Sequence, residues 1–103
     1  MAISVLKVTY TVQDAFVARN QENIARVMQE LRDSGRTDIQ YSAFLEADGK
    51  TFMHLVIKPD AGTPGPNELP AFQTFIAELQ ASQPEKPPVL TEIAMVGSNT
   101  SFF

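Results

Sequence analysis

The residue of this chain best suited to acid–base chemistry is His54, its single histidine. Imidazole is the side chain whose unperturbed pKa lies nearest to neutrality, so His54 could act as a general base on a C–H or O–H bond of a phenolic ligand. It could equally be a strand histidine that is hydrogen-bonded at a subunit interface. Lys7 is a second candidate, because a lysine inside an apolar strand could pair with a ligand oxyanion or with Glu46 or Glu92. Both pairs of alternatives stay open at this level.

The sequence lacks the residues that several other kinds of site require. The sequence has no cysteine, which excludes a thiolate nucleophile and a disulfide framework. One histidine does not make a typical zinc or iron site, so we expect no metal and no cofactor. The segment 62–66 (Gly-Thr-Pro-Gly-Pro) does not suit phosphate binding, since its prolines remove amide donors. Tyr10 and Tyr41 are interpreted as core aromatics rather than catalytic acids.

The first half of the chain predicts a strand and then a helix. Residues 3–12 alternate apolar and polar side chains and are rich in β-branched residues, which is typical of a strand. Residues 15–34 change to a helical period, with Asp14 placed to cap the start and Gly35 to end it. The buried stripe of this helix is expected to consist of Val17, Ile24, Val27, Met28 and Leu31.

The second half predicts a hairpin, a loop, a helix and a strand. Residues 38–57 alternate on both sides of Asp48-Gly49, a strong hairpin signal. Residues 58–66 hold three prolines and two glycines and therefore form a loop. A helix follows, with Asn67 as the expected cap and a stripe of Leu69, Phe72, Phe75, Ile76 and Leu79. Residues 85–88 read as an extended connector before a last strand, 89–96.

This order, β-α-β-β-α-β, predicts one α+β domain over residues 1–103. A hydrophobic content of 44% supplies a core for a single domain of this length. The order is that of the ferredoxin-like fold, an antiparallel sheet with both helices on one face. Right-handed crossovers favour the strand order 4-1-3-2.

The two faces of the sheet follow from the period of two along each strand. We expect Leu6, Val8 and Tyr10, together with Met53, Leu55 and Ile57, to pack under the helices. The opposite face then carries a mixture of apolar and polar side chains, which is typical of a lined cavity. The residues predicted to line this ligand pocket, around the candidate base His54, are Lys7, Thr9, Ser42, Phe44, Phe52 and Val56. For the second and fourth predicted strands, the alternation does not decide which side faces the helices.

The element order, the hairpin from Ile39 to Val56 and the Phe-rich segment 69–75 (Leu-Pro-Ala-Phe-Gln-Thr-Phe) resemble the dimeric α+β barrel superfamily, the antibiotic biosynthesis monooxygenase-like group. This resemblance implies a homodimer in which two sheets pair, with a pocket between sheet and second helix. Members include cofactor-independent quinone-forming oxygenases, haem-degrading enzymes and lactone isomerases. The tryptophan that such oxygenases tend to use is absent here, so no catalytic residue is carried over.

Two functions follow as hypotheses. The first is a homodimer that binds a small apolar or aromatic ligand. The alternative is a cofactor-independent oxygenase or isomerase that acts on an aromatic or polyketide-like substrate, with His54 as general base. A net charge of −4 argues against nucleic acid as a partner, and the sequence holds no apolar run long enough to span a membrane. The amino-terminus does not look like a signal peptide, so the cytoplasm is the default location.

Overall fold

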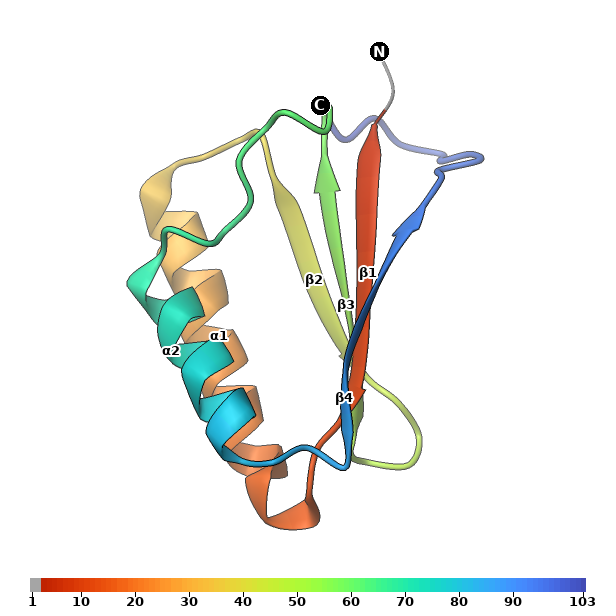
Figure 1. Ribbon diagram of the computed structural model, residues 1–103. Coiled ribbons are helices and arrows are strands. Elements are labelled where there is room, and N and C mark those ends of the chain that lie inside the picture. The colour runs from red at the N-terminus through yellow and green to blue at the C-terminus, as the bar shows by residue number, and fades with distance from the viewer. Residues whose placement is uncertain (1–2) are drawn as a thin grey trace.

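The structure, a computed structural model, describes residues 3–103 (Figure 1). Its elements are β1 (Ser4–Thr11), α1 (Val17–Ser34), β2 (Gln40–Leu45), β3 (Thr51–Lys58), α2 (Pro70–Ala81) and β4 (Lys86–Ile93). This confirms the predicted element order. The expected domain 1–103 and the amino-terminal segment also include Met1 and Ala2, which lie outside the described residues.

The strands form one antiparallel sheet in the order β2-β3-β1-β4, which confirms the predicted arrangement. The helices α1 and α2 pack against each other and cover one face of this sheet, and the opposite face carries no helix (Figure 1). Residues 3–103 therefore have the ferredoxin-like α+β fold. Neither of the helices described here is both long and apolar enough to cross a membrane.

The turn signals of the sequence are confirmed, but both expected helix caps are wrong. Gly35 ends α1 with a φ of 71°, and Gly49 adopts a φ of 77° in the β2–β3 turn, a region that favours glycine. A 3₁₀ turn that contains Asp14 precedes α1, and Asp14 makes no capping hydrogen bond. The N-cap position of α2 is Leu69 instead of Asn67.

The start of α2 is stabilised by the other helix. The carboxylate of Glu30, on α1, accepts the backbone N–H of Ala71 at 3.2 and 3.3 Å. An acceptor and a negative charge at this place satisfy a free N–H of the first turn, as a capping side chain would. Pro70 opens the helix, where its missing N–H costs nothing.

The last strand begins earlier than expected. It spans Lys86–Ile93, so the predicted connector belongs largely to β4, and the predicted end at Val96 is wrong. Lys86 pairs with Thr11, and the register shifts between Thr9 and Thr11. Pro87 and Pro88 are tolerated because β4 lies at the edge of the sheet, where one row of N–H groups is unpaired.

The face assignment of β3 is a second correction. In the register of the sheet, Phe52 lies opposite Tyr10 and His54 lies opposite Val8. Phe52 and His54 therefore lie on the helix-covered face, as Tyr10 and Val8 do. Phe52, His54 and Val56 are accordingly buried, whereas Met53, Leu55 and Ile57 lie on the open face. The expectation had these two sets exchanged. The face assignment of β1 is confirmed by the same register.

The hydrophobic core fills one end of the space between sheet and helices. Its buried members are Tyr10, Val12, Val27, Phe52, Phe75 and Leu79. Phe72 packs against this cluster but is only partly buried. Leu55, the expected neighbour of both phenylalanines, lies across the sheet from them, so that expected contact is wrong. The other end of the same space stays hollow.

Candidate functional site

The hollow between the sheet and α2 is the candidate site. It has a volume of about 620 Å³ and is lined mainly by apolar side chains. Every strand contributes: β1, β2, β3 and β4 each present residues of the helix-covered face to it. Its apolar wall includes Leu6, Val8, Val56, Phe72, Ile76 and Leu90.

A short chain of hydrogen bonds lies at the inner part of this hollow. His54, which is 2% exposed, lies between two tyrosines. Its Nε2 is 2.7 Å from the hydroxyl of Tyr10, and its Nδ1 is 2.7 Å from the hydroxyl of Tyr41. The amide Nδ2 of Asn20, on α1, donates to the Tyr10 hydroxyl at 2.9 Å. The four side chains connect α1, β1, β3 and β2 across the site.

The position of the protons in this chain follows from the need to give each one an acceptor. A neutral imidazole has one donor and one acceptor nitrogen, so one tyrosine donates to the ring and the other accepts from it. The Tyr10 hydroxyl accepts from Asn20 and is fully enclosed, so its own proton has His54 Nε2 as its acceptor. Nδ1 then donates to Tyr41. This arrangement leaves the hydroxyl proton of Tyr41 available to the cavity.

The environment keeps the whole chain uncharged. Burial lowers the pKa of His54 to about 4, because the imidazolium would lose its hydration. Burial also raises the pKa of Tyr10, against a smaller lowering by the hydrogen bond from Asn20. The pKa of Tyr41 is raised by burial and then by the charge of an ionised Tyr10. At neutral pH the site therefore consists of a neutral imidazole and two neutral phenols.

Aromatic packing fixes the orientation of these rings. The His54 ring stacks on Phe75 with centroids 5.4 Å apart, and Tyr10 stacks on Phe52 at 5.6 Å. Tyr41 meets Phe72 edge to face at 6.3 Å. Rings held from both sides lose little freedom when a ligand binds, which favours a preorganised site.

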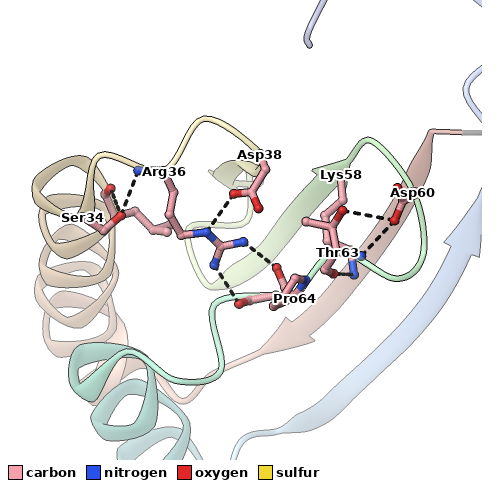
Figure 2. A network of polar contacts seen from close by, with 9 residues as sticks. Ser34, Arg36, Asp38, Lys58, Asp60, Thr63 and Pro64 are labelled. Atoms are coloured by element: carbon pink, nitrogen blue, oxygen red, sulfur yellow. Dashed lines mark hydrogen bonds and ion pairs between the residues drawn. The ribbon is translucent and has the colours of Figure 1, made fainter.

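The outer end of the hollow is polar. Ser4, Lys58 and Glu92 line it together with the loop before α2. Arg36 holds that loop in place, since its guanidinium donates to the carbonyl oxygens of Pro64 at 2.7 Å and Gly65 at 3.2 Å (Figure 2). The same guanidinium pairs with Asp38 at 2.8 Å. The rim of the cavity is thus tied to the end of α1.

The loop also has an internal fold. The carboxylate of Asp60 accepts the backbone N–H groups of Gly62 and Thr63, both at 2.9 Å. Lys58 Nζ donates to the carbonyl oxygen of Thr63 at 2.7 Å (Figure 2). Short side-chain bonds to the backbone are the usual way to shape a proline- and glycine-rich loop.

The structure divides the seven predicted site residues between the two faces of the sheet. His54 and Val56 line the hollow, and Phe52 lies in the core beside it. The remaining four lie on the open face, away from the hollow: Lys7, Thr9, Ser42 and Phe44. The roles given to all seven stay predictions. No cluster of three or more His, Asp or Glu side chains that could hold a metal ion occurs within residues 3–103.

Sequence reasoning missed Tyr10 and Tyr41 as partners of His54, and Asn20 as the partner of Tyr10. A signal for Asn20 was present, because it falls on the apolar stripe of α1 between Val17 and Ile24. A polar side chain at a core position needs a buried hydrogen-bond partner. Lys58 was missed as well, although it continues the alternation of Val56 and His54 along β3.

Comparison with solved structures shows the same fold in other proteins. The Rv0793 protein of Mycobacterium tuberculosis matches with a TM-score of 0.76 at 10% identity, over 96% of this chain and 100% of its own. A protein described as an antibiotic biosynthesis monooxygenase matches with a TM-score of 0.74 at 10% identity, over 91% of this chain and 99% of its own. A variant of SnoaB from Streptomyces nogalater is described as a cofactor-independent oxygenase. It matches with a TM-score of 0.71 at 13% identity, over 98% of this chain and 100% of its own.

These likenesses confirm the resemblance to the antibiotic biosynthesis monooxygenase-like group at the level of the fold. The sequence matches no protein-family model and has no match among curated proteins. Because one fold hosts many chemistries, the function has to be argued from the site itself.

Proposed function

We propose that this protein binds a small aromatic or otherwise largely apolar molecule in the hollow between the sheet and α2. The observation that supports this most is the cavity of about 620 Å³ with His54 and two tyrosines at its inner part. Small-molecule sites are typically mostly apolar clefts of about 300–1,000 Å³ with a few polar groups that orient the ligand. The hollow has this composition and this size.

The polar group that such a ligand meets is the hydroxyl of Tyr41. Its proton has no acceptor within the hydrogen-bond chain once His54 Nδ1 donates to its oxygen. A ligand oxygen that accepts, such as a quinone carbonyl or a phenolate, would complete the chain. The cost of leaving that donor unpaired in the filled cavity favours ligands with an acceptor over pure hydrocarbons.

The test is binding of 1,8-dihydroxyanthraquinone, a stable planar quinone, followed by fluorescence or calorimetry. Ile76→Trp fills the hollow from α2 and should abolish binding. Its matched control, Ala77→Trp, adds the same ring on the exposed side of the same helix and should leave binding unchanged. Equal binding by both variants, or no saturable binding by the wild-type protein, would contradict the proposal.

A second candidate is a cofactor-independent oxygenase, because an imidazole lies within hydrogen-bond distance of a tyrosine hydroxyl that lines the cavity. An anthrone-type phenol would lose a C–H proton, and the resulting enolate would transfer electrons to dioxygen. Overall, one anthrone and one O₂ give one quinone and one water. The proton would reach His54 through the Tyr41 hydroxyl, which requires the tautomer with an unprotonated Nδ1. The low pKa of His54 makes it a weak base in the empty site.

Oxygen uptake with 1,8-dihydroxyanthrone separates the two candidates. The oxygenase predicts quinone formation above the rate without protein, and a large loss of that rate in His54→Gln and Tyr41→Phe. A pure binding protein gives no acceleration, while it still binds the quinone product. Ala77→Trp serves again as the variant that should behave like the wild type.

We further propose that the protein is a homodimer that pairs through the open sheet face. This face exposes several apolar side chains, among them Phe44 at 48%, Val89 at 61% and Ile93 at 41%. An apolar patch of this kind on a folded chain is typical of an interaction surface. The dimeric barrel implied by the fold resemblance would cover this surface.

A further inference from the structure

The candidate cavity has two polar ends, and only the inner one is used by the binding proposed above. The outer end presents Ser4, Lys58 and Glu92. Lys58 follows His54 on the same face of β3, four residues later. At about 3.3 Å per residue the two positions are roughly 13 Å apart along the strand. A ligand that fills the length of the hollow would therefore meet polar groups at both ends and apolar walls between them.

The ammonium group of Lys58 is held at this outer end. Its Nζ donates to the Thr63 carbonyl oxygen at 2.7 Å, in the loop that Asp60 shapes (Figure 2). An ammonium has three N–H donors, so others remain for a ligand. No carboxylate of residues 3–103 forms an ion pair with Lys58. A partly buried cation without a counter-ion is a place where an anionic group gains the most.

The two other polar residues at this end, Ser4 and Glu92, lie at different places relative to Lys58. Ser4 lies directly opposite Lys58 in the β1–β3 register, so its hydroxyl can add a donor beside the ammonium. Glu92 lies opposite Leu6, on the exposed edge strand and one strand further away. Lys58 therefore lies on the same strand as His54, whereas Glu92 lies on β4, whose residues are exposed.

We propose that the ligand is an elongated aromatic molecule with an oxygen at one end and a carboxylate at the other. Tyr41 donates to the oxygen and Lys58 binds the carboxylate. This inference rests on the proposed binding function and specifies its ligand class. It also makes Lys58 a residue that determines specificity.

The first test compares three probes that differ in one end group, titrated into the wild-type protein by calorimetry. They are 4′-hydroxybiphenyl-4-carboxylate, the corresponding neutral carboxamide, and the cationic 4-(aminomethyl)-4′-hydroxybiphenyl. We expect the carboxylate to bind at least tenfold more tightly than the carboxamide, and the amine to bind weakest. Equal binding of carboxylate and carboxamide, or tighter binding of the amine through Glu92, would overturn the inference. No variant is needed for this comparison, so it does not depend on whether a substitution folds.

The second test locates the charge. Lys58→Met should remove the preference for the carboxylate over the carboxamide, and Lys58→Arg should restore most of it. Lys86→Met is the matched control, because Lys86 is an exposed lysine that does not line the hollow. A preference that survives in Lys58→Met but is lost in Lys86→Met would place the anion site outside the hollow.

The outcomes also separate this inference from the function it rests on. If no biphenyl binds and 1,8-dihydroxyanthraquinone does, the hollow binds ligands but the carboxylate assignment is wrong. If neither class of probe binds, the binding function itself is wrong. If Ile76→Trp abolishes binding of the carboxylate probe and Ala77→Trp does not, the probe lies in the hollow as proposed.

Discussion

At the scale of single residues, the most unusual feature is an imidazole with both nitrogens bonded to tyrosine hydroxyls. Such a ring has no direct access to water, and its neutral form is strongly favoured. The consequence is that His54 holds two neutral phenols in one hydrogen-bonded chain. Tyr10, His54 and Asn20 are buried, whereas Tyr41 is only partly buried and lines the cavity, so a ligand would meet the chain there.

This feature predicts how stability depends on pH. In the unfolded chain His54 takes up a proton below about pH 6.5, whereas in the folded protein it stays neutral down to about pH 4. Between these values the unfolded state binds the extra proton, so the free energy of unfolding falls as the pH falls. The slope contributed by this one group is at most about 1.4 kcal/mol per pH unit.

Urea unfolding at pH 7, 6 and 5 measures this slope. We expect the wild-type protein to lose stability over this pH interval more steeply than His54→Gln, because the variant lacks the imidazole. The comparison cancels the carboxylates that titrate in both proteins. Parallel curves would mean that His54 is readily protonated in the folded state.

At the scale of elements, α2 supplies both the core and the wall of the cavity through two phenylalanines. Phe75 is 3% exposed and packs on Tyr10 and His54. Truncation to alanine should cost about 3–5 kcal/mol, as for other buried phenylalanines. Phe72→Ala should cost clearly less, because that ring is only partly buried and borders an existing hollow.

Chemical unfolding of the two alanine variants checks the order of these losses. A loss in Phe72→Ala as large as that in Phe75→Ala would mean that the hollow closes around Phe72 in solution. Phe72→Ala should also bind the quinone probe more weakly, since it removes part of the apolar wall and the aromatic contact that orients Tyr41.

The loop before α2 gives a prediction about motion. Arg36 anchors the loop by donating to the carbonyl oxygens of Pro64 and Gly65, and Asp38 forms an ion pair with the same guanidinium. Arg36→Met should lower global stability by only about 1–2 kcal/mol but accelerate amide hydrogen exchange across residues 62–67. Arg32→Met is the control, because Arg32 is an exposed arginine whose side chain hydrogen-bonds Gln29 within its own helix. Unchanged exchange in the Arg36 variant would show that Asp60 and Lys58 hold the loop alone.

The element order, the strand order and the turns were predictable from the sequence, because period, glycine and proline signals are local. The side of β3 that faces the helices was predicted wrongly. Alternation shows which residues share a face but does not show which face is covered. Here both sides of β3 are apolar, since the open face is itself rich in aliphatic side chains.

The information needed for that assignment lay in the hairpin turn. A hairpin turn around Asp48-Gly49, closed by the bond from Glu46 N–H to the Thr51 carbonyl oxygen, places Leu45 opposite Phe52 and Ala43 opposite His54. With Tyr41 turned toward the helices, His54 had to follow. The hydrogen bond from Asn20 to Tyr10 was beyond sequence reasoning, because it depends on how α1 lies on the sheet.

At the scale of the whole molecule, the uncovered face of the sheet predicts self-association. Light scattering at micromolar concentration should give the mass of two chains, with an interface above about 1,000 Å². Phe44→Asp, on that face, should shift the protein toward monomers because a carboxylate would be buried without a partner.

The control for the dimer is Ala77→Asp, which places the same charge on the exposed side of α2. It should leave the mass unchanged. A wild-type protein with the mass of one chain would rule out the dimer. A dimer that survives Phe44→Asp would have to use another surface.

The two prolines at the start of β4 have a consequence for the behaviour of the protein at high concentration. The segment after them exposes Val89, Leu90 and Ile93 at a sheet edge, and exposed apolar residues on an edge strand favour the recruitment of further strands into aggregates. Pro87 and Pro88 carry no N–H, so the first part of this edge cannot continue a hydrogen-bonded ladder. Replacing both with threonine would restore that ladder. The expected result is fibrillar material, seen as thioflavin binding, under conditions in which the natural sequence stays dispersed.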